Sequence, residues 1–175
     1  MIHKTTRSIL SVLLAALLLV TSTPLTPAFA DGGAVSLQSE SGVSRELTGD
    51  GTKDDPYKIA TADDLLKFAQ RVNGGETTAY AVLTGDINLN PDMKIDEDGT
   101  VTGNPDQWTP IGNSSNEYTG TFDGANYTIS GLYIDSSDTD YKGLFGFVGS
   151  EGTVQNLTVT GSVKGDDYVG GVVGG

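Results

Sequence analysis

Residues 128–134 are TISGLYI and residues 153–159 are TVQNLTV, so one pattern of apolar residues returns after 25 positions. Apolar side chains within each stretch lie two apart, which is the period of a β-strand with one buried face. A second match joins GLFG, residues 143–146, to GVVG, residues 171–174, at a spacing of 28. Repeats of roughly 20–30 residues with β-branched side chains and turn glycines predict a solenoid of stacked parallel strands.

This alignment also predicts local features of the repeat. The paired apolar positions are Ile129 with Val154, Leu132 with Leu157, and Ile134 with Val159. Gly131 and Asn156 fall at the same position, and because Gly and Asn best tolerate a left-handed backbone, we expect positive φ at both. Tyr127 and Tyr133 have the opposite parity to the apolar residues, so we expect them to face outward. An antiparallel sandwich with glycine turns is the alternative, since such turns occur in any β protein.

One helix is expected, at residues 62–72, after a short strand at residues 57–59. Thr61 is a suitable N-cap, and Asp64 follows three residues later, as in a capping box. Asn73-Gly74 provides the C-terminal stop. The residues at helical spacing are Leu65, Phe68, Ala69 and Val72. We expect this apolar face to cap the first coil of the solenoid.

Residues 1–30 have the features of a Sec signal peptide. Lys4 and Arg7 make the start basic, residues 9–20 are a 12-residue apolar run, and Ala28-Phe29-Ala30 is a small-x-small cleavage site. The run is shorter than the roughly 20 residues that a membrane-spanning helix needs. The sequence therefore predicts cleavage after Ala30, a secreted or cell-surface location, and no membrane insertion of the mature chain. Residues 31–48 are polar and aperiodic and are interpreted as a flexible leader.

Charge and composition exclude several functions. The chain carries a net charge of −13, which becomes −15 when the signal peptide is removed. Such an acidic surface repels nucleic acid and anionic membranes. There is no Cys, and the only His is His3, in the signal peptide. The mature chain therefore cannot form a Ser-His-Asp triad, a Cys-His pair or an H-E-x-x-H zinc site, and the lack of disulfides favours a bacterial exported protein.

Several motifs in order resemble one known family. Five stretches resemble the GLUG-motif β-helix proteins. They are the Gly-Leu-x-Gly element at residues 143–146, the opening GTKDDPYKIATADDL at 51–65, LTGDINLN at 83–90, WTPIG at 108–112 and GTFDGANYTISGLYI at 120–134. The resemblance implies an all-β, right-handed parallel β-helix on the surface of a bacterium or secreted by it. It covers residues 49–175 as the start of such a β-helix, incomplete at its C-terminus, and implies no catalytic motif.

Three sets of side chains could carry chemistry. Acidic loops could hold calcium, although solvated carboxylates explain them as well: Asp50, Asp54, Asp55, Asp92, Asp96, Glu97 and Asp98. Turn carboxylates with two basic neighbours could resemble a polysaccharide lyase site: Asp123, Asp135, Asp138, Asp140, Asp166 and Asp167, with Lys142 and Lys164. Aromatic residues could contact sugars or pack in the core: Trp108, Tyr118, Tyr127, Tyr133 and Tyr141.

These observations favour no enzyme. We assign no catalytic, cofactor-binding or metal-ligating residue, and no cofactor. The expected function is a non-enzymatic exported surface protein used for adhesion or display, with a glycan or a host or cell-surface protein as partner. The alternative is a non-catalytic N-terminal module of a larger secreted protease or glycan-degrading enzyme.

Overall fold

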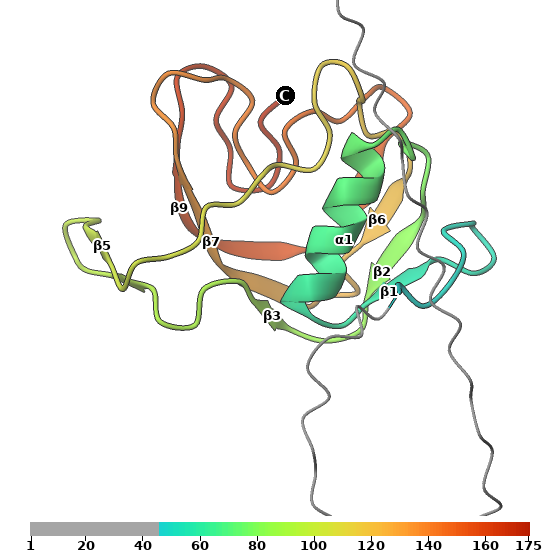
Figure 1. Cartoon of the computed structure of the whole chain (residues 1–175), viewed down its shortest axis with the longest axis horizontal. Coiled ribbons are helices and arrows are strands. Elements are labelled where there is room, and N and C mark those ends of the chain that lie inside the picture. The colour runs from blue at the N-terminus through green and yellow to red at the C-terminus, as the bar shows by residue number, and fades with distance from the viewer. Residues whose placement is uncertain (1–45) are drawn as a thin grey trace, which may run out of the picture. The chain divides into compact units, whose positions relative to one another are not determined.

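The structure, a computed structural model, describes residues 46–175. One helix and nine short strands lie in this part of the chain (Figure 1). The helix α1 is Ala62–Asn73. The strands are β1 Tyr57–Ile59, β2 Ala81–Leu83, β3 Ile87–Asn88, β4 Lys94–Ile95, β5 Val101–Thr102, β6 Thr121–Asp123, β7 Thr128–Asp135, β8 Thr153–Gln155 and β9 Thr158–Lys164.

The strands form three small sheets. One sheet has the order β1-β2-β6-β8 and the second has the order β3-β7-β9, with parallel neighbours in both. The third is the antiparallel pair β4-β5, inside the polar segment 91–107, and it projects away from the other two sheets (Figure 1). The short parallel strands join through long connections, as parallel pairing requires.

The predicted right-handed parallel β-helix is wrong. A solenoid needs coils of near-constant length, but within the first sheet Tyr57 pairs with Ala81, 24 positions on, and Ala81 pairs with Phe122, 41 positions on. Segments 103–120 and 136–152 contain only isolated bridges, and β4-β5 is antiparallel. The described residues therefore form separate small sheets and not a regular stack of coils. The alternative of an antiparallel sandwich is also wrong, because the two larger sheets are parallel.

The 25-residue alignment does not give the strand register. Ile129 pairs with Val159 and not with Val154, whose partner is Phe122. The reason is that β7 and β8 belong to different sheets, so the matching sequences TISGLYI and TVQNLTV are not neighbours in the same ladder. The 28-residue match is confirmed in one place, where Phe145 forms a parallel bridge with Val173.

Positive φ was predicted correctly at both positions, for different reasons. Gly131, at φ 71°, lies in β7 where the pairing with β9 shifts register between Ile129 and Leu132. Asn156, at φ 52°, follows β8 in the other sheet. The two residues tolerate the same backbone conformation without occupying equivalent sites.

Helix α1 begins as its sequence predicts. Asp64 donates its backbone N–H to the Thr61 hydroxyl at 3.1 Å, and the Asp64 carboxylate accepts the Thr61 N–H at 3.1 Å, which completes the capping box. The predicted apolar residues Leu65, Phe68, Ala69 and Val72 are all buried. Phe68 contacts the rings of Tyr118 and Phe122, with centroids 5.9 and 5.7 Å apart, so the helix packs its apolar face into the aromatic core.

The predicted signal peptide lies outside the described residues, as do residues 31–45 of the predicted leader. The last residues of that leader are folded, because Leu47 is buried and Thr48 pairs with Lys58. The folded part therefore begins before the predicted boundary at Gly49.

Candidate functional site

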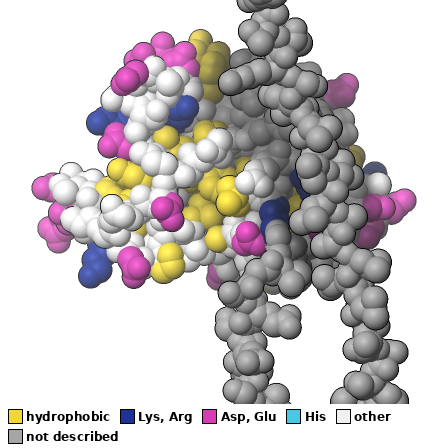
Figure 2. Space-filling model, viewed as in Figure 1, with side chains coloured by type: hydrophobic (Ala, Val, Ile, Leu, Met, Phe, Trp, Pro, Cys, Tyr) yellow, Lys and Arg dark blue, Asp and Glu magenta, His cyan; other side chains and the backbone are white. Residues whose placement is uncertain are grey.

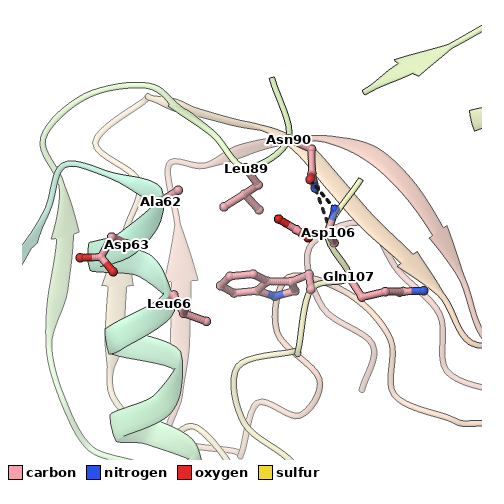
Figure 3. A pocket seen from close by; sticks show the side chains of 8 residues that line it. Ala62, Asp63, Leu66, Leu89, Asn90, Asp106 and Gln107 are labelled. Carbon is pink, nitrogen blue, oxygen red and sulfur yellow. Dashed lines mark hydrogen bonds between the residues drawn. The ribbon is translucent and has the colours of Figure 1, made fainter. Parts of the chain in front are cut away.

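A pocket of about 290 Å³ lies between the first turns of α1 and the segment that leads into Trp108. Its lining residues are Ala62, Asp63, Leu66, Leu89, Asn90, Asp106, Gln107 and Trp108. Figure 2 shows hydrophobic side chains gathered in the middle of this face, with Asp and Glu side chains spaced around them. In Figure 3, Leu66 and Leu89 project into the hollow from opposite walls.

Each residue of segment 106–108 is fixed by hydrogen bonds. The Asn90 amide accepts the Asp106 N–H at 2.7 Å and donates to the carbonyl oxygens of Asp106 and Gly131 at 3.0 and 2.8 Å. The Gln107 amide accepts the Asp135 N–H at 2.9 Å and donates to its carbonyl oxygen at 3.2 Å. Two amide side chains therefore fix this segment against β7.

Trp108 lines the pocket and is held in a fixed position. Its N–H donates to the Tyr133 carbonyl oxygen at 2.8 Å, and its indole Nε1–H donates to the Leu144 carbonyl oxygen at 3.0 Å. Only 9% of Trp108 is exposed, since the ring packs largely into the core. Because both donors are used, the indole offers the pocket an apolar surface in a fixed position.

The two carboxylates of the pocket differ. Asp63 points away from the hollow in Figure 3, and it forms an ion pair with Lys67 at 2.6 Å. Asp106 points between the apolar walls in Figure 3. Its carboxylate has no hydrogen bond or ion pair with any residue in the described range 46–175, although its backbone is bound on both sides.

Most residues of the pocket were not predicted. Trp108 was named as an aromatic candidate, whereas Leu66, Leu89, Asn90 and Asp106 were not. One signal was present, because Leu66 is apolar yet out of phase with the core-facing residues of its helix, and it is 42% exposed. The hydrogen bond from the Asp106 N–H to the Asn90 side chain could not be predicted from the sequence, because no sequence pattern relates two residues that lie 16 positions apart.

The five candidate aromatic residues lie in different surroundings. Tyr118 is buried, its hydroxyl donates to the Ala79 carbonyl oxygen at 2.9 Å, and burial raises its pKa. Tyr127 is 37% exposed, as predicted, and Tyr133 is half-buried in a second hollow with Lys164. Tyr141 stacks on Tyr168 with centroids 4.8 Å apart. They do not form one aromatic site.

The candidate acidic residues mostly organise their own turns. Asp50 accepts hydrogen bonds from Thr52, which lower its pKa, and Asp96 and Asp98 both accept the Thr100 N–H. Among residues 46–175, no group of three His, Cys, Asp or Glu side chains is arranged to hold a metal ion.

Three of the six turn carboxylates, those of Asp123, Asp135 and Asp140, are bound to neighbouring strands and turns. Asp135 forms an ion pair with Lys164 at 3.4 Å, and Asp140 accepts the Asp167 N–H at 3.1 Å. The structure brings these two pairs of residues together, but it does not gather the six candidate carboxylates, Asp123, Asp135, Asp138, Asp140, Asp166 and Asp167, around one hollow.

Two known proteins are similar to this chain. It is 36% identical over 121 residues to a protein of Evansella cellulosilytica described as a Gly-rich membrane protein, covering 69% of this chain and 12% of that protein. It is 35% identical over 156 aligned residues to halomucin of Haloquadratum walsbyi, covering 72% of this chain and 2% of halomucin. The chain thus spans a small part of each relative.

No family model matches the chain, and no solved structure matches it. Membership of the GLUG-motif family therefore stays a prediction. Within residues 46–175, no helix combines the length and the apolar character needed to cross a bilayer.

Proposed function

We propose that this chain belongs to an exported, non-enzymatic cell-surface protein that serves adhesion or display. The observation that carries the proposal is its similarity, over about 70% of its length, to a protein described as a membrane protein and to halomucin. The names of these two relatives connect them with a membrane or a mucin, and neither name states a reaction.

Export is proposed through residues 1–30. The basic start, the 12-residue apolar run and the Ala28-Phe29-Ala30 site support cleavage by signal peptidase after Ala30. The mature chain would then begin at Asp31 with a net charge of −15. A strong like charge keeps a protein soluble outside the cell.

The absence of catalysis is proposed on the chemistry of the available side chains. The chain beyond Ala30 has neither His nor Cys, which removes the side chains most used as general bases and as thiolate nucleophiles. The pocket at Trp108 combines apolar walls with a single unpaired carboxylate, Asp106, which suits recognition better than acid–base chemistry.

The test is the location of the native protein in a bacterial host. Intact cells expressing the full chain are treated with an added protease, then fractionated and probed with antibodies against residues 46–175. We expect the antigen in the cell envelope or medium, sensitive to protease, with Asp31 as its first residue. The matched control replaces Leu13 and Leu14 in the apolar run by Arg and should retain the chain inside. A wild-type chain that stays in the cytoplasm would contradict the proposal.

A further inference from the structure

We propose that the pocket at Trp108 binds a lysine or arginine side chain presented by a partner protein. The inference rests on the proposed function, since it names the chemistry of the partner that an adhesive surface protein would contact. Three properties of the pocket carry it: its size, its apolar walls and the free carboxylate of Asp106.

The pocket is small and has no open aromatic face. Its volume of about 290 Å³ lies at the lower end of the roughly 300–1,000 Å³ typical of ligand pockets. A sugar stacks on an open aromatic face, but only 9% of Trp108 is exposed. The pocket therefore fits a narrow, flexible group better than a saccharide ring.

The walls suit an aliphatic stem. Leu66, Leu89 and Ala62 surround the space above Trp108, and Leu66 leaves 42% of its surface exposed. Lys and Arg bury their methylene chains against apolar surface and keep the charged head at a polar group. The same stem would cover part of Leu66 when bound.

The charge selects a cation. Asp106 is an exposed residue whose carboxylate is directed between the walls (Figure 3), and it has no hydrogen bond or ion pair with another residue of the described part of the chain. A bound ammonium or guanidinium would donate a charge-assisted hydrogen bond to this carboxylate. The net charge of −15 expected for the mature chain also draws basic partners toward it.

The site is already formed without a partner. Asn90 holds the Asp106 backbone at 2.7 and 3.0 Å, so the point from which the Asp106 side chain starts does not depend on a ligand. Lys67, on the same helix, forms an ion pair with Asp63 at 2.6 Å.

The experiment uses the single tryptophan of the chain as a reporter inside the site. The mature protein, residues 31–175, is titrated with Nα-acetyl-lysine methylamide and Nα-acetyl-arginine methylamide while Trp108 fluorescence is recorded. Nα-acetyl-norleucine methylamide, which keeps the stem and lacks the charge, and N-acetylglucosamine are the comparison probes. We expect a saturable change with the two basic probes, weakened by added salt, and at least about tenfold weaker binding of norleucine.

Variants locate the binding. Asp106→Asn should weaken the lysine probe about tenfold, whereas Asp138→Asn, which removes one negative charge at an exposed turn, should leave it within twofold. Leu66→Ala should weaken it about fivefold while the unfolding temperature stays unchanged, since Leu66 is outside the core. Equal effects of Asp106→Asn and Asp138→Asn, or saturation by N-acetylglucosamine alone, would overturn the inference.

The two proposals fail separately. A chain that is displayed on the cell surface but gives no saturable signal with basic probes contradicts only the ligand assignment. A chain that binds the lysine probe in vitro but is retained in the cytoplasm contradicts only the proposed function.

Discussion

Asp123 connects two neighbouring strands through its side chain. Its carboxylate accepts the Ala125 N–H at 2.8 Å in its own turn, and the side-chain amides of Asn156 and Gln155 at 3.0 Å from the next strand. The Ala125 N–H and the Asn156 amide favour the charged carboxylate, so the pKa of Asp123 lies below its ordinary value of 3.8. The residue stabilises the β6–β8 edge only while it is ionised.

The first prediction follows from this ionisation. Asp123→Asn should lower the free energy of unfolding by about 1 kcal/mol at pH 7, because a charged acceptor for three donors is lost. Since the folded pKa is depressed, the stabilisation is present above pH 3.8 and disappears as the pH falls through the folded value. Urea unfolding between pH 7 and pH 2.5 should therefore show the two proteins converging. Asp138→Asn is the control, and a constant gap at every pH would contradict the assignment.

Strand pairing brings β7 and β9 into very close contact at one point. Leu132 lies opposite Gly161, and a Cβ at position 161 would collide with the backbone carbonyl of Leu132. The register of this pair shifts between Ile129 and Leu132, with the positive φ of Gly131 between them. The close approach explains why a side chain is absent from the middle of β9.

The second prediction tests this contact between strands. Gly161→Ala should destabilise the protein by about 1–3 kcal/mol, because backbone must move to admit the methyl group. Gly171→Ala is the matched control, since a Cβ at that position meets nothing within 4 Å, and it should change stability by less than about 0.5 kcal/mol. Thermal unfolding followed by circular dichroism measures both. Equal stability of the two variants would show that the strands separate more easily than the structure indicates.

Local patterns in the sequence predict the helix better than they predict which strands pair with each other. The limits of α1 follow from Thr61, Asp64 and the spacing of Leu65 and Phe68, all within one short segment. The partner of Leu132 could not be found in the same way, because sequence similarity suggested Leu157 while the constraint is the space available at Gly161. The pocket at Trp108 cannot be predicted for a related reason, since it is assembled from three segments, 62–66, 89–90 and 106–108, that lie apart in the sequence.

The molecule as a whole has a strongly acidic surface, and few of the carboxylates in residues 46–175 are paired with a basic side chain. Its net charge is −13, or −15 without residues 1–30, and the ion pairs in the described part all include exposed side chains. Exposed pairs contribute little to stability. Repulsion among the remaining carboxylates therefore opposes the compact state and is reduced by salt.

The third prediction concerns this repulsion. Raising sodium chloride from low to moderate concentration should increase the unfolding temperature of the mature chain by about 3 °C, which corresponds to roughly 1 kcal/mol for a domain of this size. Choline chloride should act equally, because screening does not depend on the cation. Calcium chloride at matched ionic strength tests the acidic loops, since a further increase would indicate a calcium site there. An unfolding temperature that falls with salt would contradict the repulsion.

The β4–β5 hairpin has a practical consequence for engineering. It occupies most of the segment 91–107 and projects from the two parallel sheets (Figure 1). The strand before it, β3, pairs with β7, which follows it in the sequence. The entropy of closing a loop grows only with the logarithm of its length. A foreign peptide grafted between Glu97 and Asp98 should therefore leave the core intact, which makes this turn a place to carry an antigenic epitope.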